Sequence, residues 1–138
     1  MKKYILIASA LFITVLFSCK ETPKTEAPTQ MQHVIAVHDE VMPKMGTMGK
    51  LIAQLEEKIN ETETPEAYEK ARKDLREANK AMMDWMKGFG DSFDGDEIMK
   101  GKALTEAKQK VLDEQEKAVE ALRDQINSSI ENAEKLLE

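Results

Sequence analysis

The sequence has a single cysteine, Cys19, among its 138 residues. No intramolecular disulfide can therefore support the fold, and burial of apolar side chains must stabilise it instead. Runs of β-branched residues and two-residue hairpin signals are absent, which argues against strands. The chain also lacks a glycine-rich phosphate loop, an HExxH metal motif and a nucleophile elbow. We therefore expect neither a β-sheet fold nor an enzyme.

The chain has no excess of basic residues. It contains 20 Lys and Arg against 26 Asp and Glu, for a formal net charge of −6. Removal of residues 1–18 would remove two lysines and no acid, which leaves 18 basic residues and a net charge of −8. Nucleic acid is bound by clustered Lys and Arg on one face, so we expect no nucleic-acid partner.

The segment before Cys19, MKKYILIASALFITVLFS, has the features of a secretory signal. Lys2 and Lys3 give a positive start, a stretch of low polarity follows, and the small residue Ser18 precedes the cysteine. The apolar stretch is too short for a membrane-spanning helix, which needs about 20 apolar residues. We therefore predict a cleaved signal peptide at residues 1–18.

Residues Leu16-Phe17-Ser18-Cys19 resemble the lipobox of bacterial lipoproteins, although Phe17 is larger than the residue usual at that place. The resemblance implies a diacylglyceryl thioether on Cys19, cleavage before it and acylation of the new amino terminus. Two or more acyl chains, at about 0.8 kcal/mol per buried CH₂, give stable anchoring. The alternatives for Cys19 are a free thiol or an intermolecular disulfide.

Residues 19–30 are predicted to form a flexible tether behind the lipidated cysteine. Two prolines, threonines and charges occur in this stretch, and its residues 20–30 include no large apolar residue. The KE pair directly after the cysteine resembles the export signal of surface lipoproteins in Bacteroidota. This pair favours outward display of the folded part.

The first predicted helix covers about residues 31–60. Its apolar seam is spaced alternately four and three residues apart, as in a coiled coil. Pro43 lies inside the helix, where it removes a backbone hydrogen bond and clashes with the carbonyl of Asp39. Because the seam continues without a phase break, we expect one helix kinked near Pro43 rather than a helix that begins there. The seam residues are Val34, His38, Val41, Met45, Met48, Ile52, Leu55 and Ile59.

A second helix is predicted over about residues 65–88. Thr64 suits the N-cap and Pro65 the first helical position, whereas Gly88 and Gly90 are typical of a helix end. The seam residues are Tyr68, Ala71, Leu75, Ala78, Met82, Trp85 and Phe89.

A third helix is predicted over about residues 102–137, after the acidic loop GFGDSFDGDE. The acids of this loop do not follow the EF-hand pattern, so helix capping by Asp94 or Asp96 is favoured over calcium binding. None of the abundant carboxylates falls on a predicted apolar seam. The stripe of the third helix is formed by Leu112, Val119, Leu122, Ile126, Ile130, Ala133 and Leu137.

Short connections make neighbouring helices antiparallel, so residues 31–138 are predicted to form an all-α, antiparallel three-helix bundle of coiled-coil-like type. The first helix would be about 45 Å long at 1.5 Å per residue. The predicted shape is a rod that stands off a membrane on a tether.

Histidine and methionine side chains are predicted to meet at one level of the rod. If the first two helices turn back near residue 62, His38 lies level with Met86 and Met42 with Met82. One imidazole and three thioethers suit Cu(I), and a His/Met pair could ligate haem. A methionine-rich core beside Trp85 explains the same residues without a ligand.

A third use of these methionines is a surface for a partner protein. Met45, Met48 and Trp85 flank the expected kink, and methionine adapts to varied ligands. A docking groove is therefore an alternative to both the metal site and the simple core.

The segments HDEVMPKM, AMMDWM with the phenylalanine that follows, and INSSIENAEKLL resemble small helical lipoproteins of Bacteroidota. Some of these carry the label "viral A-type inclusion protein". The likeness covers most of the chain after the predicted signal. It implies an anchored helical lipoprotein, and it carries over no catalytic or binding residue.

We expect a non-enzymatic module in the cell envelope, held at the outer membrane by lipid on Cys19. It would bind an envelope protein or support the envelope, with no cofactor. The alternative is a lipoprotein that binds Cu(I) or haem through His38, Met42, Met82 and Met86.

Overall fold

The computed structural model describes residues 29–138, and no strand occurs among them. The prediction of an all-helical fold is therefore confirmed for this part of the chain. The predicted signal at residues 1–18, Cys19 and the tether as far as residue 28 lie outside it. The helices are α1 (Gln30–Val41), α2 (Lys44–Glu61), α3 (Glu66–Ser92), α4 (Gly95–Met99) and α5 (Glu106–Leu137).

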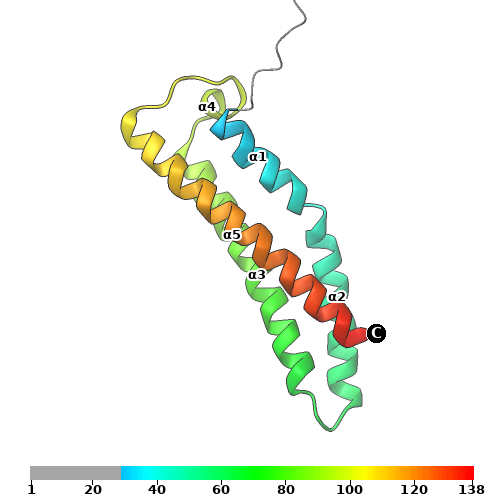
Figure 1. The fold of residues 1–138 in the computed structure, drawn as a ribbon. Helices are drawn as coiled ribbons and strands as arrows, with labels where there is room; N and C mark the ends of the chain where they lie inside the picture. The colour runs from blue at the N-terminus through cyan, green and yellow to red at the C-terminus, as the bar shows by residue number, and fades with distance from the viewer. Residues whose placement is uncertain (1–28) are drawn as a thin grey trace, which may run out of the picture.

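Four helices pack together into an elongated bundle, and the short α4 lies at one end of it (Figure 1). Figure 1 shows α1 and then α2 running down the molecule, α3 running back up and α5 running down again. The longest helix, α5, packs along α3 and also contacts α1 and α2, while α2 packs on α3. Within residues 29–138, no helix is both long and apolar enough to cross a membrane.

The first predicted helix is two helices, so the expectation of one kinked helix over residues 31–60 was wrong. Helix α1 ends at Val41 and α2 begins at Lys44, on either side of Pro43. The amide of Met42 still donates to the carbonyl of His38 at 3.0 Å, but the amide of Met45 donates to the Met42 carbonyl at 3.2 Å, three residues back. This tighter turn bridges the place where proline has no N–H to continue the ladder.

The chain keeps its direction through this break. Met42 (φ −54°, ψ −42°) and Pro43 (φ −61°, ψ −26°) both have right-handed helical dihedrals. Helix α2 therefore continues roughly where α1 stops, as Figure 1 shows.

Helix α1 begins inside the predicted tether. The side chain of Thr29 accepts a hydrogen bond from the Gln32 amide at 3.3 Å, and the Gln32 side chain accepts one from the Thr29 amide at 2.8 Å. This reciprocal capping box satisfies two amides that a helix start otherwise leaves without a partner. The last two residues of the predicted tether, Thr29 and Gln30, thus belong to the folded part.

Helix α3 starts and ends differently from the prediction. Pro65 is its N-cap, with no side-chain hydrogen bond, so Thr64 does not cap it. We expected the helix to stop at Gly88 and Gly90, but it passes through both glycines and ends at Ser92. A glycine inside a helix costs about 1 kcal/mol relative to alanine. Burial of the large Phe89 ring, 5% exposed, outweighs that cost.

The capping prediction for the acidic loop is confirmed at Asp94. Its Oδ1 accepts hydrogen bonds from the amides of Asp96 at 3.0 Å and Glu97 at 2.9 Å, which starts α4. The chain then passes through Gly101, whose φ of +68° is a conformation that favours glycine. Thr105 caps α5, so that helix begins at Glu106 rather than near residue 102.

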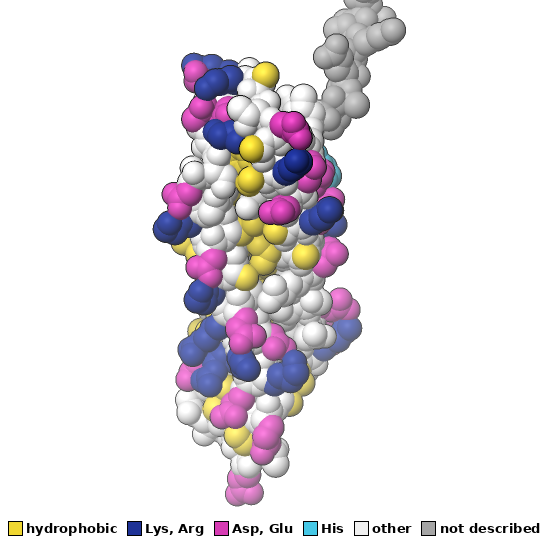
Figure 2. Space-filling model, turned by 90° about the vertical axis from the view of Figure 1, so that its left-hand side faces the viewer, with side chains coloured by type: hydrophobic (Ala, Val, Ile, Leu, Met, Phe, Trp, Pro, Cys, Tyr) yellow, Lys and Arg dark blue, Asp and Glu magenta, His cyan; other side chains and the backbone are white. Residues whose placement is uncertain are grey.

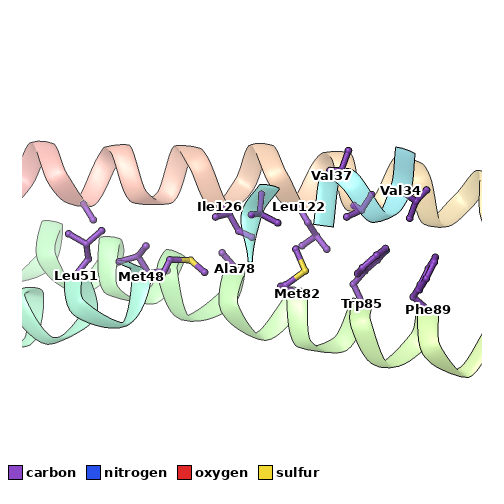
Figure 3. Close-up of a cluster of buried hydrophobic side chains, with 14 of the residues drawn as sticks. Val34, Val37, Met48, Leu51, Ala78, Met82, Trp85, Phe89, Leu122 and Ile126 are labelled. Atoms are coloured by element: carbon purple, nitrogen blue, oxygen red, sulfur yellow. The ribbon is translucent and has the colours of Figure 1, made fainter. Parts of the chain in front are cut away.

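The core runs along the whole bundle, between the seams of the long helices. Figure 3 shows a part of it. Every predicted α3 seam residue except the half-buried Tyr68 is buried. The first seam is rotated relative to the prediction, because Val37 and Leu51 are buried while His38 and Ile52 are only half-buried. The largest fully buried side chains are Met48, Leu55, Leu75, Met82, Leu112, Ile126, Val34, Val41 and Val119.

Candidate functional site

Aromatic rings form a ladder along the α4 end of α3. His38 of α1 stacks on Trp85 with ring centroids 5.8 Å apart and planes inclined by 28°. Trp85 stacks on Phe89 at 5.0 Å, and Phe89 meets Phe93 at 5.0 Å. Figure 3 shows Trp85 and Phe89 side by side on α3, beneath Val34 and Val37 of α1. The ladder therefore connects the inside of the bundle with the half-exposed imidazole.

His38 is held by a carboxylate as well as by the ring. Its side chain is 22% exposed, and its Nδ1 lies 2.9 Å from Oδ1 of Asp39. A carboxylate partner on one ring nitrogen fixes the orientation of an imidazole and leaves the other nitrogen for a further contact. In His38 that other atom is Nε2.

The stack on Trp85 places His38 beside the residue that precedes Met86. The predicted neighbour of His38 was Met86, so the observed neighbour, Trp85, lies one residue away from it. Met82 is fully buried in the core, and Met86 is half-buried against it. Met42 is half-buried at the end of α1. Ligation by these four residues stays a prediction.

Within the described chain, no three His, Cys, Asp or Glu side chains gather as they would around a metal ion. A metal held by the predicted cluster would therefore depend on thioether sulfur beside one imidazole. That donor set is soft and fits Cu(I) rather than a hard divalent ion.

The predicted partner surface is not a surface in this structure. Met48 is fully buried and Trp85 is 8% exposed, while Met45 is half-buried against the core. The indole Nε1 of Trp85 donates to the backbone carbonyl of Gln115 at 3.2 Å, so its polar atom is also satisfied inside the bundle. Met48 and Trp85 were assigned wrongly to a surface, because a seam residue and a groove residue have the same helical spacing.

A polar network joins the start of α1 to α5. His33 Nε2 lies 3.1 Å from Glu120 Oε1, and Gln30 donates to Glu116 at 2.7 Å and to Asp113 at 3.0 Å. Hydrogen bonds from the Gln30 and Gln109 amides hold the pKa of the Asp113 carboxyl below its usual value. These contacts fix the position of α1 against its neighbour.

One buried carboxylate, Glu97, was not predicted from the sequence. It is 5% exposed, and its Oε2 accepts from the Asp94 amide at 2.8 Å and from the Lys108 ammonium at 2.6 Å. The hydrogen bond from Lys108 is the main reason that the pKa of Glu97 lies below its usual value. The signal was the spacing of Asp94 and Glu97, since an acid three residues after a cap residue completes a capping box.

A groove of about 480 Å³ between α1 and α4 was also not predicted from the sequence. Met31, Ile35, Ile98 and Met99 give it apolar walls, and Thr29 lines it as well. Figure 2 shows acidic and basic side chains intermixed over one face of the molecule, with hydrophobic side chains between them. The groove arises only because the loop after α3 folds back over α1, which no local pattern predicts.

Comparisons with protein-family models, curated proteins and solved structures give no match to this chain. The function is therefore inferred from the fold and from the contacts of the described residues.

Proposed function

We propose that the chain is a lipid-anchored helical module of the cell envelope, which binds an envelope protein or supports the envelope without catalysis. We count α1 and α2 as one broken helix, which with α3 and α5 gives an antiparallel three-helix bundle. The Leu16–Cys19 lipobox and the signal-like segment before it support the anchor.

The observation that carries this proposal is the capped start of α1 at one end of an elongated bundle. Only nine residues separate Cys19 from Thr29, and ten chain steps span at most about 35 Å. A lipid on Cys19 would therefore hold the rod by its α1 end and leave the α2–α3 turn pointing away.

Several described charged side chains have structural partners, which supports a role without catalysis. The buried carboxylate of Glu97 is engaged by a helix cap and a lysine, which is a structural role. Many exposed acids and lysines on the helices form pairs one turn apart, such as Lys70 with Asp74 at 2.6 Å.

The anchor is tested by expression of the full chain in a bacterium that processes lipoproteins. Mass spectrometry of the amino-terminal peptide should show acyl mass on Cys19, and the protein should fractionate with outer membranes. Cys19→Ser should release it from membranes. The matched control Ser18→Ala keeps a small residue before the cysteine and should remain acylated. An unmodified thiol in the wild-type chain would refute the anchor.

The partner is tested by crosslinking in intact cells, followed by mass spectrometry. We expect one or a few envelope proteins that crosslink to the wild-type chain and are lost in Cys19→Ser. Recovery of the acylated chain without any crosslinked protein would leave envelope support as the role, and would end the claim of a protein partner.

A second candidate function, Cu(I) or haem binding, is favoured by the contact between His38 Nδ1 and Asp39. Metal-bound histidines commonly donate their other ring nitrogen to a carboxylate, and the imidazole of His38, paired with Asp39 through Nδ1, stacks on Trp85, the residue before Met86.

Titration of the mature chain with Cu(I) against a competing chelator decides this candidate. His38→Ala and Met86→Leu should each weaken binding at least about tenfold, whereas Met83→Leu, at an exposed methionine, should not change it. Equal binding by all four proteins, with no Soret band after incubation with haem, would end the candidate.

A further inference from the structure

Apolar side chains line the surface at the end of the bundle where α1 begins. The α1–α4 groove opens there, with Met31, Ile35 and Ile98 in its walls. Met99, at its rim, is 81% exposed, the largest exposed fraction of any large hydrophobic side chain in residues 29–138. An exposed apolar side chain beside a groove with apolar walls is able to enter an interface with another molecule or a membrane.

Charges around this end are largely neutralised by one another. Lys100 lies 2.8 Å from Asp96, Lys102 lies 2.8 Å from Asp94, and Lys108 lies 2.6 Å from Glu97. Because each of these three lysines is paired with an acid, they do not form a cationic patch for a strongly acidic ligand. Contact at this end would therefore depend on apolar burial, with the long lysine stems able to lie along an interface and keep their charge in water.

The groove also lies where the chain enters the folded part. Thr29, which caps α1, is itself one of the residues that line it. Cys19 is ten chain steps away, a span of at most about 35 Å. The opposite end of the bundle, at the start of the 27-residue α3, lies about 40 Å from the helix end near α4.

We propose that the α1–α4 end docks on the bilayer that holds the Cys19 lipid, with Met99 and Ile98 entering the lipid interface. This inference rests on the proposed anchor. The docked rod stands on its α1–α4 end and presents the α2–α3 turn to the space beyond the membrane.

A bilayer suits this end better than a protein partner because the anchor keeps lipid permanently within reach. A tethered contact forms at a high effective concentration, so even a small apolar surface can be occupied most of the time. Membrane attachment commonly combines a lipid chain with a second, weaker contact of this kind. A protein in the groove is the competing occupant, and the test distinguishes the two.

The experiment uses the lipidated full-length product. Because the thioether blocks Cys19, the substitution Met99→Cys introduces one free thiol for an environment-sensitive NBD label. The protein is reconstituted into vesicles of phosphatidylethanolamine and phosphatidylcholine that contain lipids with a nitroxide on the acyl chain. Docking predicts a blue-shifted emission and strong quenching of the label.

Two matched positions complete the depth measurement. Met83→Cys and Leu136→Cys carry the same label at side chains that are 54% and 36% exposed, farther along the rod. We expect quenching several-fold stronger at residue 99 than at either control. The difference should persist at about 1 M salt, where the Debye length of about 3 Å screens surface charge, because the contact is apolar.

The outcomes distinguish a failure of the lipid anchor from a failure of membrane docking. Acyl mass on Cys19 with equal, weak quenching at all three positions would overturn the docking and leave the anchor intact. A blue-shifted label at residue 99 that the lipid nitroxide does not quench would place it against protein rather than lipid, and would also overturn the docking. Absence of acyl mass would overturn the anchor and the docking together.

Discussion

At the scale of single residues, position on the seam decides the role of a methionine. Met82 and Met83 are neighbours on α3, but Met82 is fully buried and Met83 is 54% exposed. Consecutive residues on a helix point about 100° apart, so one faces the core and the other faces water. Composition alone cannot distinguish a core methionine from a ligand or a surface methionine, whereas the seam of α3 does so for this pair.

This pair gives the first prediction. Met82→Ala should lower the free energy of unfolding by about 2–5 kcal/mol, because it leaves a cavity between packed helices. Met83→Ala should change it by less than about 0.5 kcal/mol. Urea unfolding followed by far-ultraviolet circular dichroism measures both, and similar losses in the two variants would contradict the assigned core.

The second prediction concerns the contribution of Glu97 to the loss of folding stability at acid pH. Its pKa in the folded chain lies below the ordinary value of 4.5, mainly because Lys108 donates to it. A carboxyl whose pKa is lower in the folded chain than in the unfolded chain stabilises the fold at pH values above its unfolded pKa. That stability is lost as the pH falls through the folded pKa. Glu97→Gln should therefore lower stability at neutral pH and flatten its decline below about pH 4.5.

The flattening should be partial, because hydrogen bonds from Lys102 and Gln30 also hold the pKa values of Asp94 and Asp113 below their usual range. The control is Glu57→Gln, at an exposed glutamate of α2. Urea midpoints measured across the acid range test the prediction. An unchanged slope in Glu97→Gln would show that Glu97 does not titrate as its contacts imply.

At the scale of the helices, proline decides where α1 gives way to α2. The break at Met42 and Pro43 keeps helical dihedrals, so the missing N–H and the proline ring are its local causes. Helix α3 shows the opposite case, since two glycines near its end do not stop it. A helix breaker acts through lost hydrogen bonds, whereas a glycine only weakens a helix that burial can maintain.

The third prediction follows from this difference. Pro43→Ala restores one backbone donor without a change in dihedrals, so it should stabilise the fold by about 1 kcal/mol. The restored amide should also be protected from hydrogen exchange. Pro65→Ala is the control, because Pro65 is an N-cap whose backbone nitrogen continues no helical ladder. Loss of stability in Pro43→Ala would mean that bundle packing, and not proline, requires the break.

At the scale of the whole molecule, α5 ties the bundle together. It contacts α1, α2 and α3, so disruption at either end must be transmitted along it. Ala133 lies near its carboxyl-terminal end and is fully buried, whereas Trp85 stands towards the α4 end of the rod. A single cooperative unit should therefore unfold at both ends together.

The fourth prediction tests that cooperativity. Ala133→Asp places an unpaired charge in the core and should cost at least about 2 kcal/mol. The transition of Trp85 fluorescence should shift together with that of circular dichroism. Glu134→Asp, at the exposed neighbouring position, should shift neither. A fluorescence transition that stays at the wild-type midpoint while dichroism shifts would show that the two ends unfold independently.

The sequence by itself determined that the described chain is helical and which side of α3 is buried. The seam from Ala71 to Phe89 is predicted correctly because α3 packs against both α2 and α5, so its whole apolar stripe is covered. The Asp94 cap is equally local, since its hydrogen bonds reach only two and three residues along the chain.

Only the tertiary structure decided the features that depend on distant neighbours. The rotation of the first seam, which buries Val37 and leaves His38 half-exposed, follows from where α5 and Trp85 lie. The burial of Glu97 and the α1–α4 groove need Lys108 and Met31, which lie at least 11 residues away. Periodicity fixes which stripe of a helix is apolar, but the partner that covers the stripe is set by long-range packing, which no local pattern specifies.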